Sequence, residues 1–407
     1  MNLRTETRTR SHRRSSSRTD QTQNFETESR STSNKKRPRR PPAPTGYVVL
    51  LALIVVLNLI GLVMVLSASS VTALQYEGSS YYYFERQVLW VFIGSILTIA
   101  LLNFDYRRLR KLALPMVALS AVMLVVVLVP GLGSNVNGSS RWIGVGMFSI
   151  QPSEFAKLAM LIFAADLLAR RRAWIGDTRV TLRPVIVAFA VFAALIMLQP
   201  NLGTTIVLAA ITFTILFVAG VPLGPLAGWG LAGCCLAGMA SMGESYRRAR
   251  ILAFLHPWND PLNTGYQTIQ SQVSVASGGW LGVGLGASKA KWGFLPYAHT
   301  DFIFAIIAEE LGLVGAIVVV ALFVALGVFG VRAGLRTSDP FARLLAIGIT
   351  TWFCVQAFVN IGAVLGILPI TGVPLPFISF GGSSVLATMA ASGILLNVAR
   401  NAPGYSR

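Results

Sequence analysis

The chain has 407 residues, of which 54% are hydrophobic and only 12% are charged, with a net charge of +18. A soluble domain of this length carries roughly twice that fraction of charged residues, so the composition excludes an ordinary soluble protein. Runs of about 20 apolar residues recur along the chain and predict an all-α polytopic membrane protein. Cys234, Cys235 and Cys354 lie in apolar segments without metal-ligand spacing, and we interpret them as small core residues.

Residues 1–45 have a different composition from the rest of the chain. They contain 12 Lys or Arg against 4 Asp or Glu and very few apolar residues. Such a segment cannot bury enough apolar surface to fold alone, so we expect a disordered basic tail. The cluster KKRPRR, close to the first apolar run, favours a cytoplasmic tail attracted to anionic lipid headgroups over a nucleic-acid-binding segment.

Ten apolar segments predict about ten membrane-spanning helices. If the tail is cytoplasmic, three inner connections carry 4, 5 and 3 basic residues, whereas two outer connections carry one each. This bias favours both termini in the cytoplasm, including the C-terminal end 403–407. The membrane domain therefore covers 46–402. Its predicted spans are 46–68, 87–103, 112–130, 152–169, 184–199, 202–220, 222–242, 302–331, 343–368 and 383–400.

A large outer loop, residues 243–301, separates the seventh and eighth spans. It holds five basic residues, and a segment this long is largely exempt from the charge bias. We expect its glycine-rich part, 277–288, to be partly re-entrant, with glycines that allow close backbone packing. A dinucleotide-binding interpretation of GWLGVGLGAS is rejected because no strand precedes the glycines.

Three acidic residues stand at and inside the start of the eighth span. Thr300 or Asp301 could cap the helix N-terminus, and an ionised Asp301 at that position could also act as a general base. Glu309 lies about 12 Å deeper, where a carboxylate needs a polar partner. Lys157, which is spaced to pair with Glu154 on the same helix face, is a candidate partner. Glu154, Lys157 and Glu309 could form a structural cluster that holds the bundle together, or the floor of a polar cavity.

Other polar stretches mark the predicted outer ends of spans. QPNLGTT places Gln199 at a Pro-containing junction, and PLPFISFGGSS ends in Ser383 and Ser384. Prolines and glycines so close to a membrane indicate broken helices that line a cavity. Arg141 beside Trp142 is either an outer cation for a ligand or part of an interfacial anchor.

Five motifs follow one another in the chain: GSSRWI with FSIQPSEFAKL, QPNLGTT, YQTIQSQVSVASGGWLGVGLG, FLPYAHTDFIFAIIAEELG and PLPFISFGGSS. In this order they resemble the SEDS family of bacterial cell-wall proteins (shape, elongation, division and sporulation). The resemblance covers residues 46–402. The short link from GVGLGASKAKWGFLP to HTDF and the long N-terminal tail favour the division member over the elongation member.

This resemblance implies a ten-helix peptidoglycan glycosyltransferase that polymerises lipid II on the outer face of the cytoplasmic membrane during septal wall synthesis. Asp301, in the family's His-Thr-Asp-Phe motif, would be the catalytic residue, with His299 and Thr300 beside the substrate. Asn201 departs from the family's frequent Asp, which removes a carboxylate that a metal would need there. Tyr297 stands where an acidic or polar residue is frequent.

The implied reaction assigns roles to further residues. A sugar hydroxyl is a poor nucleophile, so Asp301 would remove its proton as the glycosidic bond forms. The leaving diphosphate gains negative charge and needs cations, among which Arg is preferred for bidentate contacts. The candidate cations are Arg141, Arg247, Arg248, Lys289 and Lys291. The other expected substrate contacts are Gln199, Ser383 and Ser384, supported from beneath by Glu154, Lys157 and Glu309.

Lipid II and the undecaprenyl-diphosphate-linked glycan are the expected substrates, and a class B penicillin-binding protein (an FtsI-like transpeptidase) is the expected partner among other divisome proteins. No cofactor is required by the sequence. A divalent cation such as Mg or Mn could assist the diphosphate, although no ligand cluster is visible. The alternatives are a lipid II flippase, a non-catalytic scaffold and an elongation polymerase.

Overall fold

The structure, a computed structural model, describes residues 45–131, 133–136, 139–145, 148–243, 248 and 252–402. The predicted tail up to residue 44, the C-terminal end 403–407 and the candidate cation Arg247 lie outside these residues.

Helices occupy all ten predicted spans. Seven helices of the described chain are long and apolar enough to cross a membrane, and two shorter apolar helices cover Leu182–Met197 and Leu223–Leu236. The helices are α1 (Thr45–Glu77), α2 (Tyr82–Asn103), α3 (Leu109–Leu128), α4 (Pro152–Arg170), α5 (Leu182–Met197), α6 (Leu202–Ala219), α7 (Leu223–Gly243), α9 (Tyr266–Ser277), α10 (Ile303–Arg336), α11 (Pro340–Val364) and α12 (Gly382–Asn401). Short 3₁₀ turns cover Tyr106–Arg108, Arg172–Trp174, Pro257–Asn259 and Ala290–Trp292.

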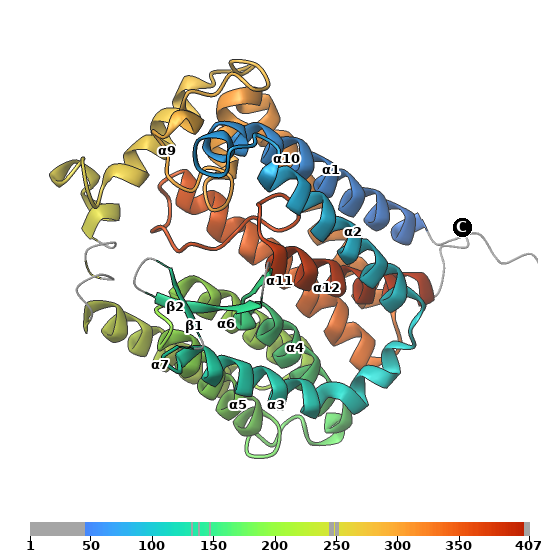
Figure 1. The fold of residues 1–407 in the computed structure, drawn as a ribbon. Helices are drawn as coiled ribbons and strands as arrows, with labels where there is room; N and C mark the ends of the chain where they lie inside the picture. The colour runs from blue at the N-terminus through green and yellow to red at the C-terminus, as the bar shows by residue number, and fades with distance from the viewer. Residues whose placement is uncertain are drawn as a thin grey trace, which may run out of the picture. The chain divides into compact units, whose positions relative to one another are not determined.

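The last two helices form the centre of the bundle. α12 packs against α2 and α4, and α11 packs against α10, α6 and α4. Figure 1 shows α1, α2 and α10 on one side of this pair and α3 to α6 on the other. Residues from both halves of the sequence therefore meet around α11 and α12.

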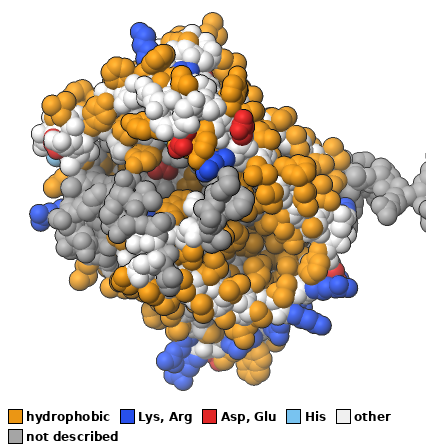
Figure 2. Space-filling view, in the orientation of Figure 1, with side chains coloured by type: hydrophobic (Ala, Val, Ile, Leu, Met, Phe, Trp, Pro, Cys, Tyr) orange, Lys and Arg blue, Asp and Glu red, His pale blue; other side chains and the backbone are white. Residues whose placement is uncertain are grey.

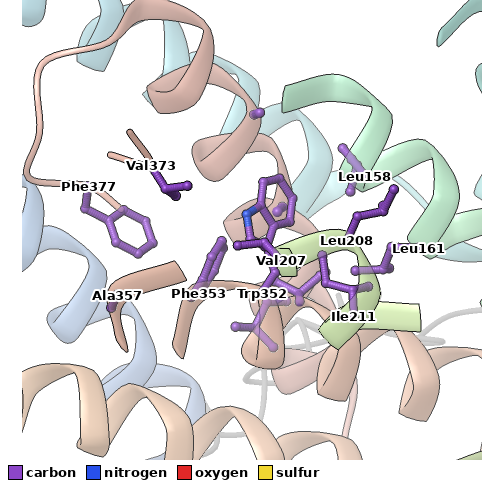
Figure 3. Packing of buried hydrophobic residues seen from close by; sticks show 14 of the residues in the cluster. Leu158, Leu161, Val207, Leu208, Ile211, Trp352, Phe353, Ala357, Val373 and Phe377 are labelled. Carbon is purple, nitrogen blue, oxygen red and sulfur yellow. The ribbon is translucent and has the colours of Figure 1, made fainter. Parts of the chain in front are cut away.

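The core is built from apolar residues of α4, α6 and α11. Trp352 and Phe353 of α11 are fully buried. Figure 3 shows Trp352 facing α4 and α6, while Phe353 lies toward Phe377 of the loop between α11 and α12. The rings of Phe353 and Phe377 meet edge to face at 5.1 Å between centroids. This packing holds the α11–α12 loop against the bundle.

Much of the surface is apolar, as a lipid-facing surface requires. Large side chains such as Phe92 of α2 and Leu114 of α3 are more than half exposed, and Figure 2 shows hydrophobic atoms covering much of one face. The prediction that the cysteines are core residues is wrong for Cys234 and Cys235, which are exposed on α7; Cys354 is partly buried. The exposure of Cys234 and Cys235 on an apolar helix is consistent with contact to lipid rather than to protein.

A small antiparallel sheet was not predicted from the sequence. Its strands, in the order β1 (Gly133–Val136), β2 (Ser139–Val145) and β3 (Phe148–Ile150), lie between α3 and α4. The pattern SSRWIGV is too short and too rich in serine and glycine to stand out as a strand. The sheet carries Arg141 and joins the start of α4.

α10 is interrupted at Gly312, whereas the sequence predicted one continuous eighth span. Gly312 has φ 67° and ψ −168°, a conformation that is essentially restricted to glycine. The break exposes backbone groups that the glycine-rich loop satisfies. Amide groups of Val283 and Gly284 donate to the carbonyls of Glu309 and Glu310, and those of Leu313 and Val314 donate to Gly279 and Trp280.

The predicted close packing of the glycine-rich loop is confirmed. A Cβ on Gly282 would stand 2.1 Å from the Glu310 carbonyl oxygen, so only glycine fits. Gly312 lies nine residues into α10, about 13 Å along the helix from Ile303. The loop packs beside this part of α10, and it follows the short helix α9, which the sequence analysis missed.

Candidate functional site

Asp301 lies just before α10, held through its backbone by α11 and the α11–α12 loop. Its carbonyl accepts a 2.8 Å hydrogen bond from Nδ2 of Asn360. The neighbouring carbonyl of Thr300 accepts from the Ser379 hydroxyl at 2.6 Å, and that of His299 accepts from the Phe380 amide at 3.0 Å. Three successive carbonyls are thus fixed, and they hold the backbone that carries the partly buried Asp301 carboxyl.

The helix-cap interpretation of this segment is wrong. α10 begins at Ile303 with Phe302 at the N-cap position, so neither Thr300 nor Asp301 occupies the cap. The Thr300 hydroxyl instead donates to the carbonyl of Tyr297 at 3.1 Å. Asp301 Oδ2 faces the α11–α12 loop, where a Cβ on Gly372 would stand 3.5 Å away.

His299 is enclosed by aromatic rings. It stacks on Tyr83 of α2 with 4.6 Å between ring centroids and lies 5.8 Å from the Phe380 ring. Burial lowers the pKa of His299 from 6.5 to about 4, so the imidazole is neutral at physiological pH. It therefore adds no positive charge beside Asp301 and can only offer neutral hydrogen bonding or packing.

The partner of Glu309 is a loop, not the predicted lysine of α4. Glu309 is buried, and its Oε1 accepts from the amide of Lys289 at 2.8 Å. Its Oε2 accepts from the hydroxyl of Ser288 at 2.5 Å and from the amide of Ala290 at 3.4 Å. The prediction of a polar partner at this depth is confirmed, but the predicted pairing with Lys157 is wrong.

Lys157 and Glu154 form the predicted pair on α4. Nζ of Lys157 lies 2.8 Å from Glu154 Oε1 and 2.8 Å from Gln356 Oε1 of α11. Trp352 also donates to that amide oxygen at 2.7 Å, and the Gln356 amide donates to the Pro374 carbonyl at 2.8 Å. A buried polar column thus runs from α4 through α11 to the loop beside Asp301.

Arg141 and Gln199 each donate hydrogen bonds to backbone carbonyls of another segment. Arg141 Nε donates to the Gln199 carbonyl at 2.9 Å and Nη2 donates to the Pro200 carbonyl at 2.6 Å. The buried Gln199 side chain donates to the Leu124 carbonyl at 3.1 Å. Asn201 caps α6, accepting from the Thr204 amide at 3.2 Å, a task that Asn performs as well as Asp. The departure from the family pattern therefore keeps the cap.

Ser383 connects the sheet to the start of α12. It accepts from the Gln151 amide at 2.9 Å and donates to the Ser149 carbonyl at 3.1 Å. Ser384 is buried beside it. We call this end of the bundle, with the sheet, Asp301 and the start of α12, the loop end.

The two lysines of the loop are placed differently. Lys291 is buried, with Nζ 3.5 Å from Glu310 Oε1, which argues against its predicted contact with substrate. Lys289 is exposed, as is Arg248. Of the predicted cations in the described residues, Lys289 and Arg248 present accessible charge.

Sequence reasoning missed Asn360 and Gln356, which hold the site from α11. Both are amides inside an apolar run and are almost fully buried. Because an amide at membrane depth must find partners, each was a detectable signal. Which carbonyls they bind could not be read from the sequence.

No cluster of metal-ligand side chains is present in the described residues. They contain no group of three or more His, Cys, Asp or Glu side chains arranged to hold an ion.

The family model for FtsW, RodA and SpoVE, described as cell cycle proteins, matches residues 48–403. The chain belongs to this family. The resemblance inferred from the five motifs is thereby confirmed, and with the apolar helices it makes the chain a multi-pass membrane protein.

Two named relatives share this similarity over nearly their whole length, and a third over about two thirds of its length. A probable peptidoglycan glycosyltransferase FtsW of Geobacter metallireducens is 41% identical over 88% of this chain and 95% of its own. The stage V sporulation protein E of Bacillus subtilis is 42% identical over 89% and 98%. A probable FtsW of Mycobacterium tuberculosis is 44% identical over 88% of this chain and 68% of its own.

Solved structures share the fold. One chain, from a study of polymerization and crosslinking by a peptidoglycan synthase complex, has a TM-score of 0.71 and 30% identity, covering 86% of this chain and 97% of its own. The RodA of Thermus thermophilus, a rod shape determining protein, has a TM-score of 0.64 and 28% identity, covering 88% and 97%.

Proposed function

We propose that this chain is a peptidoglycan glycosyltransferase that polymerises lipid II at the division septum. The observation that carries the proposal is the placement of Asp301, in the motif HTDF, on a segment fixed by Asn360, Ser379 and Phe380. Relatives at 41% and 44% identity named as probable peptidoglycan glycosyltransferases support it.

In the proposed reaction, the 4-hydroxyl oxygen of a lipid II sugar forms a bond to the anomeric carbon of the growing glycan. The bond from that carbon to the undecaprenyl diphosphate breaks, and the diphosphate leaves with the electron pair. The hydroxyl proton passes to the Asp301 carboxylate, which acts as general base. The anomeric carbon develops oxocarbenium-like charge as in other glycosyl transfers.

The surroundings of Asp301 suit this role. The aromatic enclosure keeps His299 neutral, so the imidazole does not form an ion pair that would weaken the base. The rigid backbone of residues 299–301 lowers the cost of aligning the base with a bound hydroxyl. Lys289 and Arg248 are candidates to bind the diphosphate.

We further propose that the loop end faces outward and that both termini are cytoplasmic. The Lys and Arg bias of the connections supports this orientation, and Figure 2 shows basic side chains gathered near the α2–α3 connection. A class B penicillin-binding protein is the proposed partner, because the solved chain with a TM-score of 0.71 comes from a study of a peptidoglycan synthase complex.

The test is polymerisation of labelled lipid II by the purified chain with its transpeptidase partner, whose own active site is inactivated. We expect wild type to make glycan strands and Asp301→Asn to lose at least about 100-fold in rate, the usual contribution of a general base. The variant's unfolding temperature, measured alongside, checks that it is folded.

Two outcomes would contradict the proposal. Full activity of folded Asp301→Asn would remove the base from Asp301. Absence of strands from wild type, together with lipid II translocation in vesicles, would favour a flippase.

A further inference from the structure

Two lysines in the stretch SKAKW stand two residues apart, and one is buried while the other is exposed. Lys291 is 5% exposed, and its ammonium is bound to Glu310 and to the Gly286 carbonyl. Lys289 is exposed, and no acidic side chain among the described residues pairs with its ammonium. Lys291 thus forms an internal ion pair, whereas Lys289 is accessible at the surface.

Glu309 fixes the backbone at the presented lysine. Its carboxylate binds three consecutive residues, through the Ser288 hydroxyl and the amides of Lys289 and Ala290. Charge-assisted bonds of this kind are about twice as strong as neutral ones. Because Glu309 is itself 2% exposed, the bonds are shielded from water, and the Cα of Lys289 has little freedom.

The same carboxylate closes a ring that contains Asp301. Asp301 lies just before α10 and Glu309 lies within it, before the Gly312 break, and the bond from Glu309 to Lys289 spans 20 residues of sequence. Within the ring, the amide of Leu295 binds the Ala290 carbonyl and that of Phe302 binds the Tyr297 carbonyl. Two short hydrogen-bonded turns therefore lie between Lys289 and Asp301 in this ring.

Glu310 supplies the matching anchor on the other side. Its carboxylate accepts from the Ser67 hydroxyl of α1 at 2.7 Å and from the Ser288 amide at 3.3 Å. It neutralises Lys291 and ties the loop to α1. Glu310 thus attaches the loop to α1, and the adjacent Glu309 fixes the backbone at Lys289.

We propose that Glu309 is a positioning residue that holds Lys289 where its ammonium binds the diphosphate of the lipid-linked substrate. Lys291 is the buried counter-ion of Glu310 and does not touch substrate. This inference rests on the proposed glycosyltransferase function. A lysine ammonium suits the role as a compact point charge, provided that its backbone is fixed.

A double-mutant cycle tests the coupling. We expect Lys289→Gln to lower kcat/KM for lipid II about tenfold, equivalent to about 1.4 kcal/mol, and Glu309→Gln to lower it by a similar factor. The double variant should be no worse than Lys289→Gln, because Glu309 acts through the lysine. Lys289→Arg should restore most of the activity, which a purely structural role would not predict.

Lys291→Gln is the matched control. It removes the same charge two residues away, so we expect a lower unfolding temperature but an unchanged dependence of kcat/KM on ionic strength. Lys289→Gln should weaken that dependence, since an exposed cation attracts an anionic substrate less as salt rises. If Glu309→Gln fails to fold, Ser288→Ala, which removes one bond of Glu309, replaces it in the cycle.

The outcomes separate the inference from the function. Losses that multiply to about 100-fold in the double variant, or an inert Lys289→Gln, would overturn the inference while the enzyme remains active. If wild type makes no glycan, the proposed function fails first. Binding of undecaprenyl diphosphate to wild type, Lys289→Gln, Glu309→Gln and the double variant then tests the coupling, and additive losses of binding free energy would overturn it.

Discussion

The side-chain amide of Asn360 anchors the backbone that carries the proposed base, Asp301. Nδ2 of Asn360 donates at 2.8 Å both to the Asp301 carbonyl and to the Val373 carbonyl. Each of these carbonyls would be left without this donor if the amide were lost. An unpaired buried carbonyl costs about 1–3 kcal/mol, so Asn360 both stabilises the fold and aligns the site.

We expect Asn360→Leu to lower the free energy of unfolding by about 2 kcal/mol and the polymerisation rate about tenfold, because two buried carbonyls lose their donor. Thermal unfolding in detergent and the lipid II assay measure the two effects. Ser392→Ala is the control, since that buried hydroxyl bonds only within α12, to Thr388. A wild-type rate for Asn360→Leu would show that this contact does not align Asp301.

His299 gives the site a pH dependence of known sign. Its folded pKa of about 4 lies below the unfolded value near 6.5. The unfolded chain therefore binds more protons between these values, and stability falls as pH drops from about 6.5 toward 4, while it is fully present above 6.5.

At pH 5 this difference is worth about 2 kcal/mol. We expect His299→Phe to flatten the drop in unfolding temperature between pH 7.5 and 5, because the phenyl ring keeps the stacking without a titrating group. An unchanged pH profile in the variant would mean that other groups cause the drop.

At the scale of elements, the interrupted helix α10 and the glycine-rich loop depend on each other. The loop supplies donors and acceptors for the backbone groups that the Gly312 break frees. A broken helix at membrane depth is stable only where protein replaces those bonds. The loop that presents Lys289 is thereby fixed to the helix that carries Glu309.

Gly312→Ala should disrupt this pairing. The added Cβ would stand 2.3 Å from the Gly282 nitrogen, in a conformation that alanine rarely adopts. We expect a marked fall in unfolding temperature and in lipid II polymerisation.

Gly233→Ala in α7 is the comparison, because nothing lies within 4 Å of a Cβ there. That change should be neutral or stabilising by up to about 1 kcal/mol. Equal effects of the two substitutions would contradict a special role for the break.

At the scale of the whole molecule, orientation can be tested directly. In a chain whose native cysteines are replaced, Leu262→Cys lies in the outer loop and Ser338→Cys in the α10–α11 connection, and both positions are exposed. An impermeant maleimide added to intact spheroplasts should label position 262, while position 338 should react only after permeabilisation. The reverse pattern would place the loop end inside the cell.

Local pattern predicted much of this molecule. The apolar runs predicted the positions of ten helices, and glycine spacing predicted a loop in close backbone contact. The i,i+3 spacing gave the pair of Glu154 and Lys157. These features depend on neighbours in sequence, for which helix geometry is known in advance.

Partners distant in sequence were decided by the tertiary structure alone. The sequence placed Glu309 with Lys157, but the fold gave Lys157 to Gln356, 199 residues away, and Glu309 to the loop. It also separated Lys289 from Lys291, which the sequence treated alike. Buried polar groups must pair, so their presence is predictable from the sequence, whereas the identity of each partner depends on how the helices pack.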